Sequence, residues 1–185
     1  YILHDRGADN CYSWAGTVCH DSLELLENDK ITEVELLPRF EKGIAEMDSL
    51  GLEFPKDFRG TDEIRRRYIE DICHFCKTYY RPKGKFTTEE LLIYQVNDKL
   101  AIRGYADLLR WGNDNEVSVL DYKTSSNYAE KDLLEHGRQL TIYGMALEQA
   151  GYKVKSTAWI MLKYVVINFN WYATKRSKIK TPLTR

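Results

Sequence analysis

Apolar residues recur at helical spacing near the start of the chain. Between residues 13 and 28 they run from Trp14 to Leu26 at intervals of three or four. This spacing predicts a helix with one buried face. His20 and Glu24 then share another face of that helix, one turn apart.

Two more helices are predicted before the pattern changes. A capping-box sequence at residues 32–35 starts the first of them, which should end near Gly51. Pro38 should kink this helix or split off its first turn. The next helix opens at Thr61, with acidic side chains in its first turn, and must end before Pro82.

After Gly84 the apolar period becomes that of strands. Three segments show it, with Asn97-Asp98 as a tight turn between the first two. A helical pattern follows from about Glu130 to Gln149, and a further strand is expected from Ser156 to Phe169. The three strand segments are 89–96, 99–110 and 116–123, the last two joined by a turn at 112–115.

This order of elements predicts a mixed α/β fold in a single domain over residues 1–185. Residues 1–80 form its helical part, 84–170 its sheet with the last helix, and 171–185 a basic tail. The largely apolar run 117–120 is typical of a strand covered on both faces.

Composition agrees with a folded, soluble protein. Hydrophobic residues make up 43% and aromatic residues 12% of the chain, which argues against disorder. No run of apolar residues is long enough for a membrane span, and residues 1–10 lack the apolar run of a signal peptide. We therefore expect a cytoplasmic protein without a membrane partner, in the host cytoplasm if the protein is viral.

The net charge of −1 conceals an uneven distribution. Residues 1–120 carry 16 basic and 23 acidic side chains, whereas residues 121–185 carry 11 and 5. The basic segment 173–185 is suited to attracting a polyanion, but it is equally typical of a solvated terminus. Charge alone therefore neither requires nor excludes a nucleic-acid partner.

Two carboxylates and a lysine are expected on adjacent strands. Asp107 ends the sequence Arg-Gly-Tyr-Ala-Asp, and Asp121-Tyr122-Lys123 follows fourteen residues later. Alternation along a strand places Asp121 and Lys123 on one face, with the Tyr122 carbonyl between them. Such oxygen ligands suit Mg²⁺ or Mn²⁺, and the lysine can orient a water for phosphodiester hydrolysis. An exposed cross-strand ion pair is the alternative interpretation.

Other polar residues are placed to join this group. His20 lies one turn after Gly16 on the first helix. Gln139 and Tyr143 stand four residues apart on the helix after the Asp-Tyr-Lys strand, so they point the same way. Two further carboxylates within plausible reach are Glu24 and Glu90.

In this order, the histidine, Gly-Tyr-Ala-Asp, Asp-Tyr-Lys and Gln…Tyr motifs resemble the PD-(D/E)XK nuclease superfamily. The resemblance is to the RecB-like exonuclease branch, which also resembles the nucleases of CRISPR adaptation. It covers about Ser13 to Lys163. It implies a restriction-endonuclease-like core, α-β-β-β-α-β, with a mixed central sheet flanked by helices. The earlier helices would form an N-terminal cap that carries the histidine. Ala106 stands where the superfamily name has proline, a common relaxation in this branch.

The resemblance also implies roles for the matching residues. Asp107 and Asp121 would bind Mg²⁺ or Mn²⁺ together with the Tyr122 carbonyl, and neutral His20 would be a further ligand. Lys123 would position or activate the attacking water. Gln139 and Tyr143, the remaining pair, would hold the nucleic-acid backbone and order the active site.

The cysteines do not match the iron–sulfur relatives of this branch. Those relatives carry three cysteines after the Gln…Tyr motif, whereas this chain has none after Cys76. We therefore expect no iron–sulfur cluster. Cys73 and Cys76 have zinc-like spacing and could join Cys11 and Cys19, but buried thiols on a helix are the simpler interpretation.

Three functions remain open. The first is a divalent-metal-dependent DNA nuclease, either an exonuclease or an end-processing enzyme. Such an enzyme would act on DNA in recombination, repair or viral (phage) DNA metabolism, with protein partners in a repair complex. The second is a structure-specific or restriction-like endonuclease. The third is a DNA-binding module that does not cut. Retention of both aspartates and the lysine speaks against this last one, and the motifs do not separate the first two.

Overall fold

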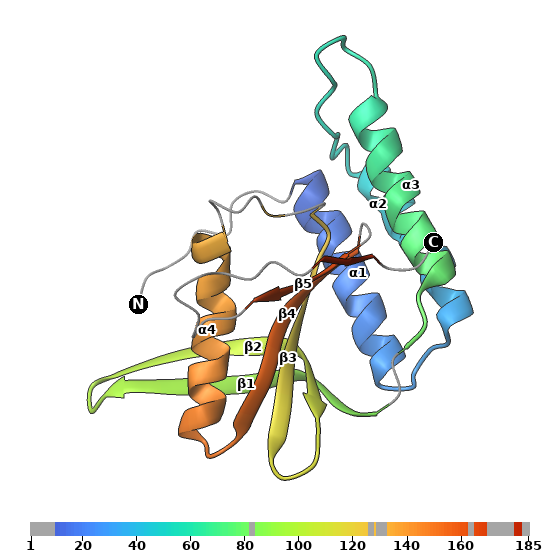
Figure 1. The fold of residues 1–185 in the computed structure, drawn as a ribbon. Helices are drawn as coiled ribbons and strands as arrows, with labels where there is room; N and C mark the ends of the chain where they lie inside the picture. The colour runs from blue at the N-terminus through green and yellow to red at the C-terminus, as the bar shows by residue number, and fades with distance from the viewer. Residues whose placement is uncertain are drawn as a thin grey trace.

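A computed structural model describes residues 10–81, 84–125, 128, 133–162, 165–169 and 180–182. Helices and strands follow one another in nearly the predicted order (Figure 1). In the described residues they are α1 (Cys11–Glu27), the 3₁₀ turn η1 (Glu33–Glu35), α2 (Leu36–Ser49), α3 (Glu63–Thr78), β1 (Lys85–Asn97), β2 (Leu100–Trp111), β3 (Glu116–Lys123), α4 (Leu133–Gln149), β4 (Lys153–Met161), β5 (Val165–Phe169) and β6 (Lys180–Pro182).

The strands within the described residues form one mixed sheet in the order β1-β2-β3-β4-β5-β6. β1, β2 and β3 pair antiparallel, and β4 then lies parallel to β3. A parallel neighbour requires a crossover, which α4 provides. The predicted mixed α/β fold with a restriction-endonuclease-like core is confirmed.

Helices cover both faces of the sheet (Figure 1). Alternation along β3 divides its side chains between two hydrophobic cores: Tyr122 packs with α1, α2 and α3, whereas Val117 and Val119 pack with α4. This confirms that β3 is buried on both faces. Asp121 and Lys123 follow the same alternation and lie on the α4 side.

Local capping explains where the first helices begin. Asn10 accepts hydrogen bonds from the N–H groups of Tyr12 and Ser13, and α1 therefore starts two residues earlier than predicted. The predicted capping box is present, since the Glu35 carboxylate accepts hydrogen bonds from the Thr32 N–H at 2.8 Å and hydroxyl at 2.9 Å. This turn is the 3₁₀ segment η1, split from α2 as Pro38 predicted.

The prediction of one strand from Ser156 to Phe169 is wrong. β4 ends at Met161, and β5 pairs antiparallel with it, so the chain reverses between them. The segment is apolar on both sides of the reversal and contains no glycine or proline. Apolar pattern alone therefore gave no sign of a turn.

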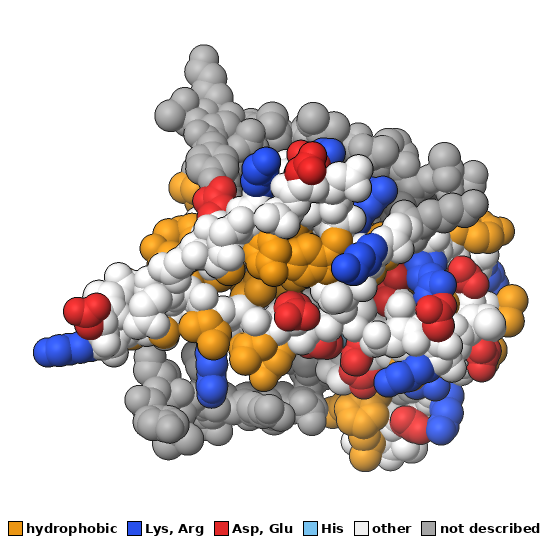
Figure 2. Space-filling model, turned by 90° about the horizontal axis from the view of Figure 1, so that it is seen from below, with side chains coloured by type: hydrophobic (Ala, Val, Ile, Leu, Met, Phe, Trp, Pro, Cys, Tyr) orange, Lys and Arg blue, Asp and Glu red, His pale blue; other side chains and the backbone are white. Residues whose placement is uncertain are grey.

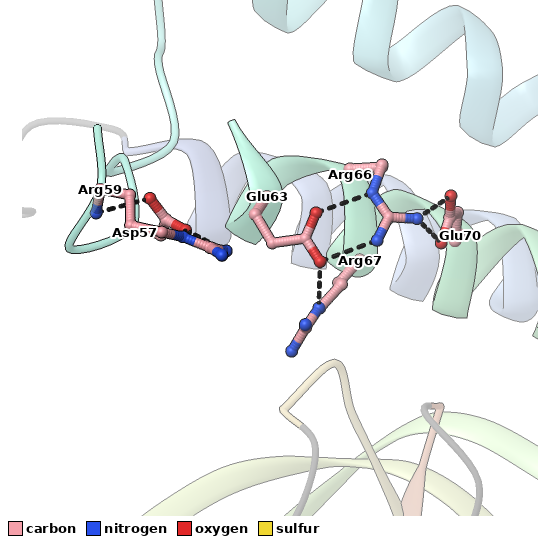
Figure 3. A network of polar contacts seen from close by, with 6 residues as sticks. All are labelled: Asp57, Arg59, Glu63, Arg66, Arg67 and Glu70. Carbon is pink, nitrogen blue, oxygen red and sulfur yellow. Dashed lines mark hydrogen bonds and ion pairs between the residues drawn. The ribbon is translucent and has the colours of Figure 1, made fainter. Parts of the chain in front are cut away.

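The exposed side of α3 carries a network of ion pairs rather than free cations (Figure 3). Arg66 contacts Glu63 at 2.7 Å and Glu70 at 2.6 Å, and Arg67 contacts Glu63 at 2.6 Å. Such i, i+3 and i, i+4 pairs satisfy the guanidinium groups locally. The arginine run of α3 is thus a self-compensated helix surface.

Candidate active site

The strands β2 and β3 separate where the two aspartates lie. Their backbone pairing runs from Trp111–Val117 to Leu108–Leu120. At the next position, Asp107 Oδ2 accepts the N–H of Tyr122 at 2.8 Å, so a side chain takes the place of a backbone acceptor. We call the place where β2 and β3 separate, at Asp107 and Asp121, the fork. The N–H and C=O groups of one strand residue point to the same neighbouring strand, so the Tyr122 carbonyl points into the fork.

Asp121 is a buried carboxylate with little local compensation. Its side chain is fully inaccessible. Lys123 Nζ lies 2.6 Å from Oδ2, and Oδ1 has no hydrogen-bond donor among the described residues. Burial raises the pKa of Asp121 to about 6; Lys123 opposes this shift and Asp107 adds to it. The unpaired oxygen marks a place where a cation would be stabilised.

Lys123 links this carboxylate to α4. Burial disfavours its ammonium ion, but the charges of Asp121 and Asp107 outweigh burial and raise its pKa. The ammonium group donates to Gln139 Oε1 at 3.4 Å, and Gln139 Nε2 donates to Tyr143 Oη at 2.9 Å. Lys123 is therefore charged at neutral pH and held between a carboxylate and an amide.

The chain of contacts ends on the backbone of β2. Tyr143 Oη donates to the carbonyl oxygen of Tyr105 at 2.6 Å. A Cβ at Gly104 would lie 2.7 Å from Tyr143 Cε1, so only glycine admits the ring at this distance. Gly104 thereby allows α4 to connect both strands of the fork.

His20 approaches the fork from the other face of the sheet. Its Nδ1 lies 3.4 Å from Asp107 Oδ2, and its ring meets that of Tyr122 edge-on at 6.3 Å between centroids. Burial and the Lys123 charge lower the pKa of His20, whereas Asp121 and a backbone hydrogen bond with Tyr122 act in the opposite direction. The imidazole is therefore neutral at pH 7 and available as a ligand.

The Tyr122 side chain is anchored by residues that the sequence analysis did not identify. Its hydroxyl lies 3.0 Å from that of Tyr79, which donates to Glu27 Oε1 at 2.9 Å. These three residues come from β3, the end of α3 and α1. No sequence spacing links them, because only the fold brings them together.

Of the two additional carboxylates, Glu24 acts on Glu89, as does Asp107, whereas Glu90 lies opposite Ala106 on β1. Asp107, Glu24 and Asp21 all act on Glu89, whose pKa is raised by burial first and by these charges second. Glu89 has a positive φ of 48° and faces the α1 side. Glu89 is therefore a β1 carboxylate on which the Asp107 charge acts, and the sequence analysis did not name it.

Glu90 lines a cleft of about 770 Å³. This cleft lies around the turn 112–115 and the C-terminal end of α4, with Trp111 and Tyr152 in contact at 5.1 Å between ring centroids. Figure 2 shows hydrophobic side chains gathered in the middle of this side of the molecule. The residues that line this cleft do not include Asp107, Asp121 or Lys123.

The fork offers a donor set that fits a divalent cation. No three His, Cys, Asp or Glu side chains of the described residues form a ready metal-binding cluster. Asp107 nevertheless lies 3.4 Å from the His20 imidazole and accepts the Tyr122 N–H, and an Asp121 oxygen is buried without a donor among the described residues. Hard oxygen ligands with an excess of negative charge suit Mg²⁺ or Mn²⁺.

The cysteines are buried or partly buried thiols. Burial raises the pKa of Cys19, and its neighbours Cys73 and Cys76 add to the shift. All four are free cysteines; Cys11, Cys19 and Cys76 are buried and Cys73 is partly buried.

The mixed sheet, the crossover helix and two carboxylates with a lysine at the fork define a restriction-endonuclease-like protein. Comparison with protein families agrees: the family model of the PD-(D/E)XK nuclease superfamily matches residues 4–179. The chain belongs to this superfamily, whose members are generally nucleases that act on nucleic acid and typically use divalent metals. No curated protein matches the chain. In the part of the chain that the structure describes, no helix is long and apolar enough to cross a membrane.

Proposed function

We propose that the protein hydrolyses phosphodiester bonds of DNA at the fork between β2 and β3. The observation that carries the proposal is a partly buried carboxylate, Asp107, beside a buried one, Asp121, with Lys123 Nζ 2.6 Å from Asp121. A purely structural ion pair would not require a second carboxylate and a neutral histidine beside it. Two like charges at one buried site are costly unless a cation is bound there.

Asp107, Asp121, the Tyr122 carbonyl and His20 would hold the metal ion. When bound, the ion supplies Lewis acidity toward a phosphate oxygen and lowers the pKa of a water. The donor set of oxygens suits Mg²⁺ and Mn²⁺ alike, and the imidazole favours Mn²⁺ of the two.

Lys123 orients the attacking water and offsets negative charge as it develops on the phosphate. Its amine is held by Asp121 and Gln139, so it is positioned before substrate arrives. Gln139 and Tyr143 in turn fix the β2 backbone through the Tyr105 carbonyl. Their role is to order the site and to contact the nucleic-acid backbone.

Within the superfamily, we assign the chain to the RecB-like exonuclease branch and infer an end-processing role in recombination, repair or phage DNA metabolism. The histidine on α1, 3.4 Å from the first aspartate, supports this assignment, because the resemblance to that branch includes this residue. A restriction-like or structure-specific endonuclease uses the same fork and is the second candidate.

Replacing Asp121 by alanine should abolish cleavage and leave the fold intact, because its carboxylate makes no hydrogen bond that holds the sheet. EDTA should abolish cleavage by the parent protein. Asp98→Ala is the matched control, since Asp98 is an exposed aspartate at the tip of the β1–β2 hairpin. Undiminished cleavage by purified Asp121→Ala protein would overturn the proposal.

Substrate topology separates the exonuclease from the endonuclease. Linear and covalently closed circular DNA, single- and double-stranded, are incubated with the protein and Mg²⁺ or Mn²⁺. Degradation of linear molecules alone is the result expected of an exonuclease. Nicking of closed circles would instead assign the endonuclease.

A further inference from the structure

The hairpin of β1 and β2 has one face that α4 covers and one that it does not. Leu92 and Gly104 are directly opposite each other and pack toward α4, where Gly104 meets Tyr143. Neighbouring residues therefore point to the opposite face. Leu91 pairs there with Tyr105, and Ile93 with Arg103. We call these four residues the hairpin patch: Leu91, Ile93, Arg103 and Tyr105.

The hairpin patch is exposed and unpartnered. Tyr105 exposes 56%, Ile93 53% and Leu91 44% of their surfaces. Arg103 is also exposed, and its guanidinium makes no hydrogen bond or ion pair with a described residue. An aromatic ring, two aliphatic side chains and a free cation thus lie together on one surface. Figure 1 shows the hairpin extending past α4.

The patch lies next to the candidate active site along β2. Arg103 and Tyr105 are alternate residues on one face, about 7 Å apart, and Asp107 follows Tyr105 by two residues. Tyr143 holds the backbone at Tyr105 through its hydrogen bond to the carbonyl oxygen. The exposed ring is therefore presented on a fixed backbone, two residues from a residue proposed to bind the metal.

We propose that the hairpin patch binds unpaired nucleotides next to the cleavage site. A base stacks on Tyr105 with Leu91 and Ile93 beside it, and Arg103 pairs with a phosphate further along the strand. The inference rests on the proposed nuclease function and gives its substrate class: a single strand, or the frayed end of a duplex.

Physical reasons favour this occupant. Aromatic rings bind unpaired bases without regard to sequence, because each base has a π face. In a duplex those faces are stacked within the helix and do not reach a side chain. Arg103 lies on the same strand as Asp107, the proposed metal ligand. Its positive charge complements the phosphates of a nucleic-acid strand better than it complements an apolar protein surface.

The test is binding of a fluorescent oligothymidylate in EDTA, followed by anisotropy. Tyr105→Ala should weaken binding about 5- to 100-fold, whereas Tyr105→Phe should bind like the parent. Arg103→Ala should weaken binding and reduce the slope of log K against log salt by about 0.7. Tyr80→Ala and Arg110→Ala are matched controls, because both residues are exposed and lie away from the patch.

Three results would overturn the inference. One is equal affinity of Tyr105→Ala and the parent for the single strand. Another is a parent dimer that Tyr105→Ala dissociates, which would assign the patch to a second copy of the chain. For a blunt duplex, affinity should not change; an equal loss there would also contradict stacking on a base.

Because EDTA removes the metal, this measurement is independent of catalysis. A protein that binds as expected but never cleaves refutes the nuclease proposal and not the patch. A protein that cleaves normally but shows no effect of Tyr105→Ala refutes the patch and not the nuclease.

Discussion

At the scale of single residues, burial sets the properties of the site. Asp121 is inaccessible and has a pKa of about 6, while His20 is held neutral by burial and by Lys123. Without metal, burial therefore favours the protonated, neutral carboxyl group of Asp121 and the deprotonated, neutral imidazole of His20. A bound cation would reverse that preference for Asp121.

Metal affinity should therefore fall as pH decreases through 6. The raised pKa means that ionising Asp121 between about pH 4 and 6 destabilises the metal-free native state, and a metal ion must displace this proton. Calorimetric titration with Mn²⁺ should show an affinity about 4-fold weaker at pH 5.5 than at a pH well above the Asp121 pKa. This factor counts the protonation of Asp121 only. Asp121→Asn should bind Mn²⁺ weakly at either pH. Equal affinity of the parent protein at pH 5.5 and 7.5 would contradict the assignment of Asp121 as a ligand.

Gly104 and Gly16 should respond oppositely to alanine. At Gly104 the new Cβ would meet the Tyr143 ring at 2.7 Å, and Gly104→Ala should destabilise the protein by about 1–3 kcal/mol and reduce activity. At Gly16 the nearest atom, Thr124 Oγ1, is 3.6 Å away, and alanine should stabilise α1 by about 0.5–1 kcal/mol. Urea unfolding of both variants measures this. Equal effects of the same sign would show that the close approach at Tyr143 does not matter.

The motif residues could be predicted because their spacing is local. Asp121 and Lys123 alternate on one strand, and Gln139 and Tyr143 lie one turn apart, so sequence alone places each pair. Glu89 was not identified, because its positive φ is visible only in the structure. Tyr79 and Glu27 join Tyr122 through contacts between distant segments, which no local pattern encodes.

At the scale of elements, α1 is the part that brings the histidine to the sheet, and its position depends on α2. Trp14 Nε1 donates to the Gly43 carbonyl at 2.9 Å. A Cβ at Gly43 would lie 2.6 Å from both methyl groups of Val18. The two helices therefore approach as closely as glycine permits, and His20 lies two residues beyond this contact.

Gly43→Ala should push α1 away from α2 and destabilise the protein by about 1–3 kcal/mol. The double variant Gly43→Ala/Val18→Ala should recover part of this loss, because the clashing methyl groups are gone. Chemical denaturation of the single and double variants gives the coupling energy. Strict additivity of the two substitutions would show that the helices do not touch here.

At the scale of the whole molecule, acidic and basic residues are unevenly distributed along the chain. The acidic part of the chain includes α1 with its carboxylates near Asp107, and the excess of basic residues follows Asp121 in sequence. The segment 171–185, expected to be a basic tail, lies outside the described residues except for 180–182 in β6. The fold class could be predicted from element order; the reversal after β4 could not, since apolar residues continue across it.

The most direct test of the central claim is the single-turnover rate of DNA hydrolysis by Asp107→Asn with Mn²⁺. Asparagine keeps an oxygen that can accept the Tyr122 N–H, so the fork should stay folded while one negative ligand is lost. We expect a rate more than about 100-fold below that of the parent, with an unchanged melting temperature. A rate equal to the parent's, in protein shown to be folded, would contradict the claim that this fork is the active site.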